Sequence, residues 1–462
     1  MANLFGHYVS RLIIYMCLVE YLILFTSMFI IFNLDFMSGI EKKSSYFVVL
    51  SGLIFSSTTS LSALSAGFYN RKLSKYSYEI IKRLIISYVI SFFILLLIYY
   101  IFPEATIPGS ILVLSILISC IAILITRVLF NKFTRMEEFK TRILVFGCGK
   151  IANSLTPFYQ KYDEKDFMIV GFYDTGNEQV FVDESLLVSS TQPLSSLSRD
   201  LNIDEIVIAL DDRSEFLPFD ELLDCKVLGI QVMELLSFYE KEERLINLEY
   251  LNPYWFLFSK GFYNRKTRGF IKRAVDIVAS LLLLMTSSPV IMLAILAIYL
   301  ESLGRGSIFY SQNRVGLNGV CFKLYKFRSM IPQAEVSGIK MTSVNDSRIT
   351  RVGAFLRKYR IDELPQILNI LKGDMHFIGP RPERPEFVND FNKRIVYYHE
   401  RHRVKPGLTG WAQLCYSYGS NEYDTIQKLQ YDLYYVKNQS FFLDLTIILQ
   451  TVEVILFGKG GR

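Results

Sequence analysis

Two adjacent carboxylates, Asp362 and Glu363, lie within a stretch that also carries arginines and a proline, residues 357–365 (RKYRIDELP). Pro365 suits the first position of a helix, because a missing N–H costs nothing there. Leu364 precedes that proline and is pushed out of the α region, so a helix arriving from the N-terminal side should break at the carboxylates. The pair is therefore expected at a helix N-terminus, where unpaired N–H groups and the helix dipole favour negative charge, including that of phosphate.

Two further stretches place basic residues where they could meet this pair. Residues 375–379 read as an extended segment that could return Arg381 towards the carboxylates, and prolines restrict the backbone on both sides of that arginine. Residues 322–330 alternate like a strand and would present Lys326 and Arg328 on one face. Arginine matches phosphate with two parallel hydrogen bonds, and lysine serves as a point charge.

Each basic residue, taken singly, could equally be a solvated surface charge. The convergence of several arginines around two carboxylates instead favours a rigid site for an anionic, phosphate-bearing substrate. The basic run 393–405 reads as a membrane-facing or phosphate-facing surface.

The composition of the chain indicates membrane segments. Of its 462 residues 51% are hydrophobic and 15% are aromatic, which is high for a soluble protein. A net charge of +6 fits contact with anionic lipid or phosphates better than nucleic-acid binding. The six cysteines are scattered without a C-x-x-C spacing, so neither a disulfide framework nor a zinc site is expected.

Residues 1–135 are predicted to form a bundle of four membrane helices. Each apolar run is close to the roughly 20 residues needed to cross a bilayer. Basic residues follow the second and fourth runs, which places both termini of the bundle in the cytoplasm, although Lys42 and Lys43 disagree with that orientation. Glu20, inside the first run, could be functional or could bond a neighbouring helix. The runs are 12–34, 46–66, 84–102 and 110–130.

Residues 141–235 read as a Rossmann-like α/β domain. Gly147, Gly149 and Ala152 satisfy G-x-G-x-x-G/A directly after a buried strand. Asp174 ends the next strand, near the distance expected for a ribose-binding acid. Two interpretations stay open: accessory nucleotide binding, or glycines that only allow a tight turn and helix packing.

A linker, 236–268, leads to a catalytic domain at 269–462 that begins with a broken apolar run, 272–300. Basic residues flank this run on both sides, which a spanning helix should not have. Pro289, preceded by Ser288, removes a backbone hydrogen bond and kinks the run near its middle. These features favour a re-entrant helix that dips into one leaflet and returns, over a fifth crossing.

The region 270–462 resembles the bacterial sugar transferase family, the polyprenyl-phosphate hexose-1-phosphate transferases or monotopic phosphoglycosyl transferases. The earlier helices and α/β domain resemble the large form of that family. The chain's opening at Phe5–Val9 and its close at Phe457–Arg462 resemble a subgroup found with exopolysaccharide systems beside a PEP-CTERM sorting locus. The matching motifs are Lys272–Asp276, Ser288-Pro289, Tyr325–Met330, Asp362–Gln366, Gly379–Glu383, Pro406–Gln413 and Tyr431–Val436.

The resemblance implies transfer of a sugar 1-phosphate from a UDP-sugar to undecaprenyl phosphate at the bacterial inner membrane, with the catalytic domain in the cytoplasm. It implies that Asp362 is the nucleophile, forming a phosphosugar–aspartyl intermediate, and that Glu363 holds Mg²⁺ or handles protons. Arg357 and Arg381 match phosphate-contacting arginines, and Glu383 lies in the same motif. Asp432 and Asp444 match later acidic positions, with a substrate role and a structural role both open.

The expected fold thus combines a membrane α-helical bundle, a Rossmann-like α/β domain and an α/β monotopic catalytic domain with a re-entrant helix. An epimerase or oxidoreductase is a weaker alternative, because the only Tyr-x-x-x-Lys spacing, Tyr78/Lys82, precedes the α/β domain. A non-catalytic scaffold for polysaccharide assembly is another. A homodimer through the bundle or the α/β domain is a further hypothesis. No residue pattern identifies the sugar.

Overall fold

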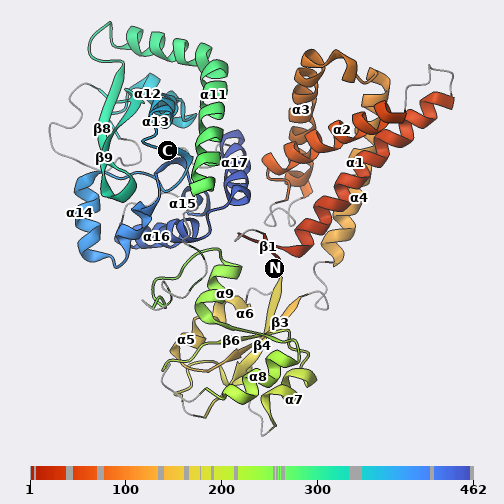
Figure 1. The fold of residues 1–462 in the computed structure, drawn as a ribbon, viewed down its shortest axis with the longest axis vertical. Helices are drawn as coiled ribbons and strands as arrows, with labels where there is room; N and C mark the ends of the chain where they lie inside the picture. Colours follow the sequence, from red (N-terminus) through yellow and green to blue (C-terminus); the bar gives the residue numbers. More distant parts are fainter. Residues whose placement is uncertain are drawn as a thin grey trace. The chain divides into compact units, whose positions relative to one another are not determined.

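The protein folds into two compact units, seen in a computed structural model (Figure 1). One unit comprises Met1–Asn3 and Tyr8–Glu243, and the other comprises Leu4–His7 and Arg244–Arg462. The structure describes residues 2–4, 7–37, 45–69, 77–133, 140–160, 166–176, 178–188, 192–212, 217–252, 255, 259, 261, 266–331, 346–416 and 421–457. The basic loops used above for orientation fall largely on 70–76 and 134–139, outside these residues.

The chain begins with a short two-stranded sheet, and a bundle of long helices in the first unit follows it. The apolar runs predicted above all form helices, and within the described residues five helices, one of them in the second unit, are long and apolar enough to cross a membrane. The elements are β1 (Ala2–Leu4), β2 (His7–Val9), α1 (Arg11–Met37), α2 (Ser45–Ser65), α3 (Ser77–Ile101), the 3-10 turn η2 (Pro103–Ala105) and α4 (Gly109–Phe133).

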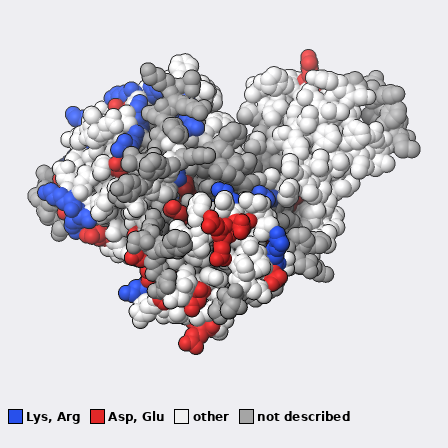
Figure 2. Space-filling model, turned by 60° about the horizontal axis from the view of Figure 1, so that its bottom comes forward, with Lys and Arg blue, Asp and Glu red and all other residues white. Residues whose placement is uncertain are grey.

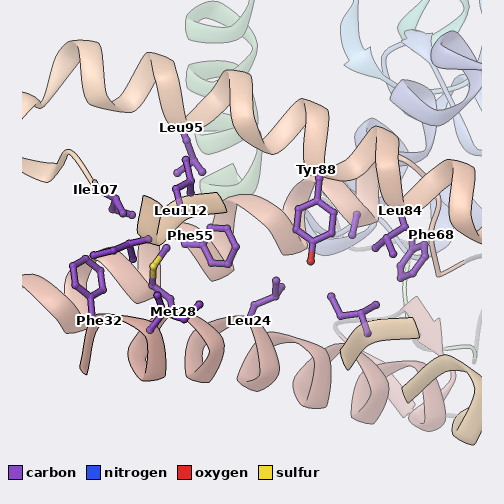
Figure 3. Close-up of a cluster of buried hydrophobic side chains, with 14 residues drawn as sticks. Leu24, Met28, Phe32, Phe55, Phe68, Leu84, Tyr88, Leu95, Ile107 and Leu112 are labelled. Carbon is purple, nitrogen blue, oxygen red and sulfur yellow. The ribbon is translucent and has the colours of Figure 1, made fainter. Parts of the chain in front are cut away.

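The bundle buries apolar side chains between its helices and also exposes large apolar side chains on its outer surface, as is typical of helices in lipid. Met28, Phe55 and Leu95 are fully buried between the helices (Figure 3). Large apolar side chains such as Leu22 and Phe93 point outward and are more than half exposed. Figure 2 shows the described side chains of the bundle almost free of charge on the face in view.

Polar contacts inside the bundle join its helices. Glu20 on α1 is paired with Arg127 on α4 at 2.8 Å and accepts a hydrogen bond of 2.8 Å from Tyr69. Hydroxyl pairs join α2 to α3, through Thr59 and Ser91 at 2.9 Å. These contacts pair the buried polar groups that they involve and join the helices to one another. For Glu20 the structure therefore supports the structural interpretation.

The α/β part of the first unit confirms the predicted parallel sheet. Its strands lie in the order β5-β4-β3-β6-β7, all parallel. Leu144, Phe146 and Ile206 form its core with residues from the covering helices. The final helix, α9, is tied to the sheet by a buried ion pair between Lys241 and Glu205, so this part extends beyond residue 235.

The elements of the α/β part follow one another along the chain. They are β3 (Thr141–Phe146), α5 (Lys150–Asn153), α6 (Thr156–Gln160), β4 (Phe167–Tyr173), η5 (Glu184–Leu186), β5 (Leu187–Val188), α7 (Leu194–Asp200), β6 (Glu205–Ile208), α8 (Phe219–Val227), β7 (Gln231–Glu234) and α9 (Leu235–Glu242).

The second unit packs one long helix and several shorter helices around two small sheets. An antiparallel hairpin pairs β8 with β9, and β10 pairs in parallel with β11. The elements are α11 (Lys266–Glu301), β8 (Phe309–Val315), η6 (Leu317–Gly319), β9 (Cys321–Phe327), α12 (Arg351–Lys358), η7 (Ile361–Gln366), α13 (Ile367–Lys372), β10 (His376–Ile378), α14 (Pro385–Arg394), η8 (Tyr398–Arg403), β11 (Gly407–Thr409), α15 (Trp411–Cys415), α16 (Glu422–Lys437) and α17 (Phe441–Leu456).

Helix α11 contains Pro289 and has two limbs that run in different directions (Figure 1). Proline lacks the N–H that would bond the carbonyl oxygen of Met285. The hydroxyl of Ser288 donates to that oxygen at 2.8 Å and replaces the missing bond. The Ser-Pro pair therefore allows a bend without leaving a carbonyl unpaired in an apolar helix.

Candidate functional site

The carboxylate pair lies in a tight turn between two helices. Thr350 caps α12, accepting a hydrogen bond from the backbone N–H of Gly353, and the helix ends before Arg360. Arg360 has a left-handed backbone with φ of 58°, uncommon for a residue other than glycine. The 3-10 turn η7 then carries Asp362 and Glu363, both less than 8% exposed, into α13. The arriving helix ends at Lys358, just before the pair, where the sequence predicted a break. The pair itself lies in η7 and not at the start of a helix beginning at Pro365, because α13 begins only at Ile367.

Glu363 is held by basic side chains from three elements. Its Oε1 lies 2.8 Å from Arg381 Nη2, 3.1 Å from Lys326 Nζ and 3.7 Å from Arg360 Nη1. Burial alone would raise the pKa of this carboxyl, but Arg381, Lys326 and Arg360 outweigh it and hold the pKa well below its usual range. Glu363 is thus a charged anchor for the site.

Asp362 differs from its neighbour in having free carboxylate oxygens. Among the described residues no side chain or backbone group forms a hydrogen bond or ion pair with this carboxylate. Burial raises its pKa; Lys326 opposes this, and the charge of Glu363 adds to it. An unpaired, largely buried carboxylate beside several cations is available to a phosphorus centre.

The structure brings only some of the predicted phosphate ligands to this pair. Lys326 and Arg381 contact Glu363, and the charge of Arg357 acts on Asp362 while its Nε donates to Ser329 at 2.8 Å. Arg328 donates instead to the carbonyl oxygen of Arg305, at 3.0 Å.

Glu383 also has a partner away from the pair. It lies 3.3 Å from Arg314 on β8, and its carbonyl oxygen accepts from the N–H of Val315. No described contact joins either Arg328 or Glu383 to the two carboxylates. Glu383 instead fixes the segment that carries Arg381 against the β8–β9 hairpin.

The backbone that presents Arg381 is packed without spare room. Gly379 follows β10, and an added Cβ there would lie 2.4 Å from the carbonyl oxygen of Lys405. An added Cβ at Gly407 on β11 would lie only 2.1 Å from the backbone nitrogen of Gly379. Glycine is therefore required at both positions for the parallel pairing of β10 and β11.

Arg401 holds the backbone of Arg381 in place. Its Nη2 donates to the carbonyl oxygen of Arg381 at 3.0 Å and pairs with Asp432 on α16 at 2.7 Å. Its Nη1 donates to the hydroxyl of Tyr398 at 2.8 Å. Arg401 is only 7% exposed, so the interpretation of the basic run as a surface is wrong at this residue.

Asp432 carried the signal that could have revealed this pair. It lies among apolar residues at helical spacing, with Leu429 and Leu433 on the buried face of α16. An acid on such a face requires a buried partner. The sequence does not show which basic residue supplies it.

The start of α11 is anchored in the same unit. Lys272 bonds Asp444 at 3.0 Å and the carbonyl oxygen of Ile378 at 3.1 Å. Asp276 bonds the ring of His376 and the N–H of Phe377. These contacts join the apolar helix to β10, three residues before Arg381. They favour the structural role for Asp444.

His7 is a buried residue of the second unit whose packing role sequence reasoning did not predict. Its Nδ1 lies 3.0 Å from the hydroxyl oxygen of Tyr434. The ring centroids of His7 and Trp411 lie 5.4 Å apart in an edge-to-face arrangement. Burial, helped by Arg244, lowers its pKa to about 3, so the ring is neutral at ordinary pH. In the opening segment Phe5 and Gly6 lie outside the described residues, as do 458–462 at the close.

Replacing His7 with alanine is expected to destabilise the second unit by about 1–3 kcal/mol, because the hydrogen bond to Tyr434 is lost and a cavity opens. Thermal unfolding of the purified full-length chain measures the effect. His399→Ala is the control, since that side chain is 66% exposed, and it should change little. Equal melting temperatures for the two variants would contradict the packing role of His7.

The effect of the His7→Ala substitution on stability should also depend on pH. Unfolded His7 takes up a proton below its ordinary pKa of 6.5, whereas the folded residue resists protonation down to about 3. Acid therefore favours unfolding of the wild type through this residue, by up to about 1.4 kcal/mol per pH unit. The wild type should therefore exceed His7→Ala in free energy of unfolding by a smaller amount at pH 5 than at neutral pH.

Comparison with known proteins adds family evidence. A family model described as "Bacterial sugar transferase" matches residues 267–458, and one described as "CoA-binding domain" matches 64–215. A UDP-N-acetylgalactosamine-undecaprenyl-phosphate N-acetylgalactosaminephosphotransferase of Aeromonas hydrophila is 46% identical over 193 residues, 42% of this chain and 45% of that protein. An undecaprenyl-phosphate glucose phosphotransferase of Komagataeibacter xylinus is 39% identical over 41% of this chain and 36% of that protein.

A third relative is matched over much more of its length. It is the UDP-glucose:undecaprenyl-phosphate glucose-1-phosphate transferase of Klebsiella pneumoniae, 31% identical over 349 residues, which are 72% of each chain. The chain thus spans less than half the length of the first two relatives and nearly three quarters of the third. Because that relative is 31% identical and the match covers 72% of its length, the chain belongs to the bacterial sugar transferase family.

Proposed function

We propose that this protein transfers a sugar 1-phosphate from a UDP-sugar to undecaprenyl phosphate and releases UMP, as an initiating step of exopolysaccharide synthesis. The observation that carries the proposal is the pair of buried carboxylates with opposite surroundings: Glu363 bound by three cations, and Asp362 unpaired among the described residues. The printed names of the three relatives support the choice of donor and acceptor.

In this proposal Asp362 is the nucleophile. One of its carboxylate oxygens attacks the β-phosphorus of the UDP-sugar, and the bond from that phosphorus to the bridging oxygen breaks, so UMP leaves. An oxygen of undecaprenyl phosphate then attacks the same phosphorus, and the bond to Asp362 breaks. Two displacements allow one site to accept two bulky anionic substrates in turn.

The basic residues around the pair have a defined task in this scheme. Lys326 and Arg381 contact Glu363, and in this scheme they also stabilise the charge that develops on the transferring phosphoryl group. Arg357 is held by Ser329 with its charge acting on Asp362. Arg328 and Glu383 are given no direct role in this scheme, because their described contacts are with Arg305 and Arg314 and not with the two carboxylates.

Magnesium fits the donor set. Mg²⁺ is usually held by one or two carboxylates together with substrate phosphates and water. Asp362 and Glu363 supply two adjacent carboxylates, and within the described residues no larger cluster of His, Cys, Asp and Glu is present. Bound there with the substrate, the ion would neutralise phosphate charge.

We further propose that α11 is re-entrant and that the second unit, which carries Asp362 and Glu363, lies on the cytoplasmic face of the bacterial inner membrane. Both limbs of the helix are held by the same unit: Lys272 and Asp276 bond residues around β10, and Ile298 packs in one cluster with Phe327 of β9. Between them the chain exposes apolar side chains such as Met285, which is 68% exposed. A helix that returns to the unit it left need not cross the bilayer.

The topology can be tested with a single cysteine beside Pro289. In a chain without its six native cysteines, Val290→Cys should resist a membrane-impermeant maleimide added to intact cells, because the bend stays within one leaflet. Glu104→Cys, in the exposed turn η2 between α3 and α4, is the control expected to react from the periplasm. Labelling of Val290→Cys from outside would exclude the re-entrant arrangement.

The function itself is tested by UMP release from purified full-length protein. A panel of UDP-sugars, including UDP-glucose and UDP-N-acetylgalactosamine, is incubated with undecaprenyl phosphate and Mg²⁺. At least one sugar should yield UMP and a lipid-linked sugar diphosphate in equal amounts. Absence of UMP across the panel would refute the proposed donor class.

A further inference from the structure

The loop that follows β3 in the α/β part is built like a phosphate-binding site. In dinucleotide-binding folds the turn after the first strand offers consecutive backbone N–H groups to a pyrophosphate, near the point where strand order reverses. Here β3 lies between β4 and β6, and Gly147 and Gly149 lie directly after it. The matching family description, CoA-binding domain, implies a phosphate-bearing cofactor for this part.

The N–H groups of this loop are already used by the protein's own carboxylates. Glu178 Oε2 accepts from Cys148 N at 2.9 Å and from Gly149 N at 3.2 Å. Asp211 accepts from the next two residues, with 2.9 Å from Oδ2 to Lys150 N and 2.7 Å from Oδ1 to Ile151 N. Four successive donors, residues 148–151, are thereby satisfied.

The two carboxylates come from different segments and are linked to each other. Glu178 follows β4 and Asp211 follows β6, on opposite sides of β3. The backbone N–H of Asp211 donates to Glu178 Oε1 at 2.6 Å. The acid at the ribose-binding position, Asp174, also bonds its own loop, accepting from Gly176 N at 2.8 Å.

The glycines make room for these protein groups. A Cβ at Gly149 would lie 2.5 Å from the Asp211 carboxylate, and one at Gly147 would lie 2.6 Å from the carbonyl oxygen of Ala209. Gly147 also has φ of 123°, which a residue with a side chain rarely adopts. The glycine spacing that matches a nucleotide motif is therefore accounted for by the approach of Asp211 and of the chain after β6.

We infer that Glu178 and Asp211 form an internal lock that replaces a phosphate ligand, and that this α/β part does not bind CoA or a dinucleotide. A phosphate would have to displace both carboxylates, and any carboxylate that stayed nearby would repel it. The lock joins the loops after β3, β4 and β6 into one rigid edge. The residues thus do not fit the cofactor that the family description implies.

Hydrogen exchange of the full-length protein in detergent micelles tests the inference. In the wild type the amides of 148–151 should be protected without ligand, and millimolar CoA, NAD or inorganic pyrophosphate should change neither their exchange nor the melting temperature. In the double variant Glu178→Ala/Asp211→Ala the same amides should exchange roughly tenfold faster or more, because charge-assisted bonds are lost. Glu178→Gln and Asp211→Asn, which keep the side-chain shape, provide milder versions if the double variant folds poorly.

Asp183→Asn is the matched control. Asp183 is an exposed acid of the same part that caps η5, with no described bond to the 148–151 loop, and its replacement should leave loop exchange unchanged. Stoichiometric binding of CoA, NAD or pyrophosphate to the wild type with added protection of these amides would overturn the inference. Unchanged exchange in the double variant and in both milder variants would overturn it equally.

Discussion

Asparagine in place of Asp362 is expected to reduce sugar-phosphate transfer by roughly a thousandfold or more, the scale of loss seen when a nucleophile is removed. The amide has nearly the shape of the carboxylate, so the cluster around Glu363 should persist. Its oxygen is a poor nucleophile, so no covalent intermediate can form. UMP release with a reactive UDP-sugar, measured against the wild type, gives the effect.

A second readout separates the nucleophile from a charge that only assists. With UDP-sugar alone and no lipid acceptor, the wild type should become labelled with one phosphosugar per chain, and Asp362→Asn should not. Asp390→Asn makes the same substitution at an acid that is half exposed and paired with Arg394, and it should keep full activity. Full transfer by Asp362→Asn would refute the assignment of the nucleophile.

Removing the Asp432 carboxylate is expected to give the largest loss of stability. Asp432→Ala leaves Arg401 buried without its counterion, a change that typically costs about 3–5 kcal/mol. Burial makes this pair different from an ion pair in water, where the median contribution is small. Thermal unfolding and transfer activity of the full-length variant should both fall, since Arg401 also holds the carbonyl oxygen of Arg381.

A double variant distinguishes the two consequences. Arg401→Met/Asp432→Leu removes both charges, and such replacements are often neutral for stability. Stability should therefore recover, whereas activity should stay low because the backbone at Arg381 has lost its donor. Arg394→Ala, which breaks exposed ion pairs in the same unit, should affect neither. The positioning role would be wrong if the double variant transferred sugar as well as the wild type.

The membrane helices and the strands of the α/β part were predictable because their signals are local. An apolar run of about 20 residues forms a helix in lipid whatever its neighbours, since its backbone groups have no other partners. The strands at 141–146 and 167–173 contain the mainly hydrophobic runs 143–146 and 167–173, bounded by polar residues, as buried parallel strands do. Asp362, Glu363 and Arg381 could be singled out for a similar reason, because prolines and charges mark them within short segments.

Contacts between distant segments were not predictable. The alternation of residues 322–330 predicted that Lys326 and Arg328 would lie on the same face of one strand. Only Lys326 contacts Glu363, because β9 ends at Phe327 and Arg328, beyond its end, bonds Arg305 instead. Arg401 looked like one basic residue of a surface run until its pairing with Asp432 was seen. The glycine loop satisfied a nucleotide motif, and its partners Glu178 and Asp211 lie 29 and 61 residues away in the sequence.

For the carboxylate pair itself, the sequence determined that two acids would lie at a proline-marked turn among arginines. Local sterics at Leu364 and Pro365 and the charges of nearby residues suffice for that. Only the tertiary structure decided which acid is bound and which is free. That difference depends on Lys326 and Arg381, which arrive from two other elements and reach Glu363 but leave the oxygens of Asp362 unpaired among the described residues. Neighbours in the chain share a turn, but their electrostatic surroundings are set by the packing of segments that the turn does not encode.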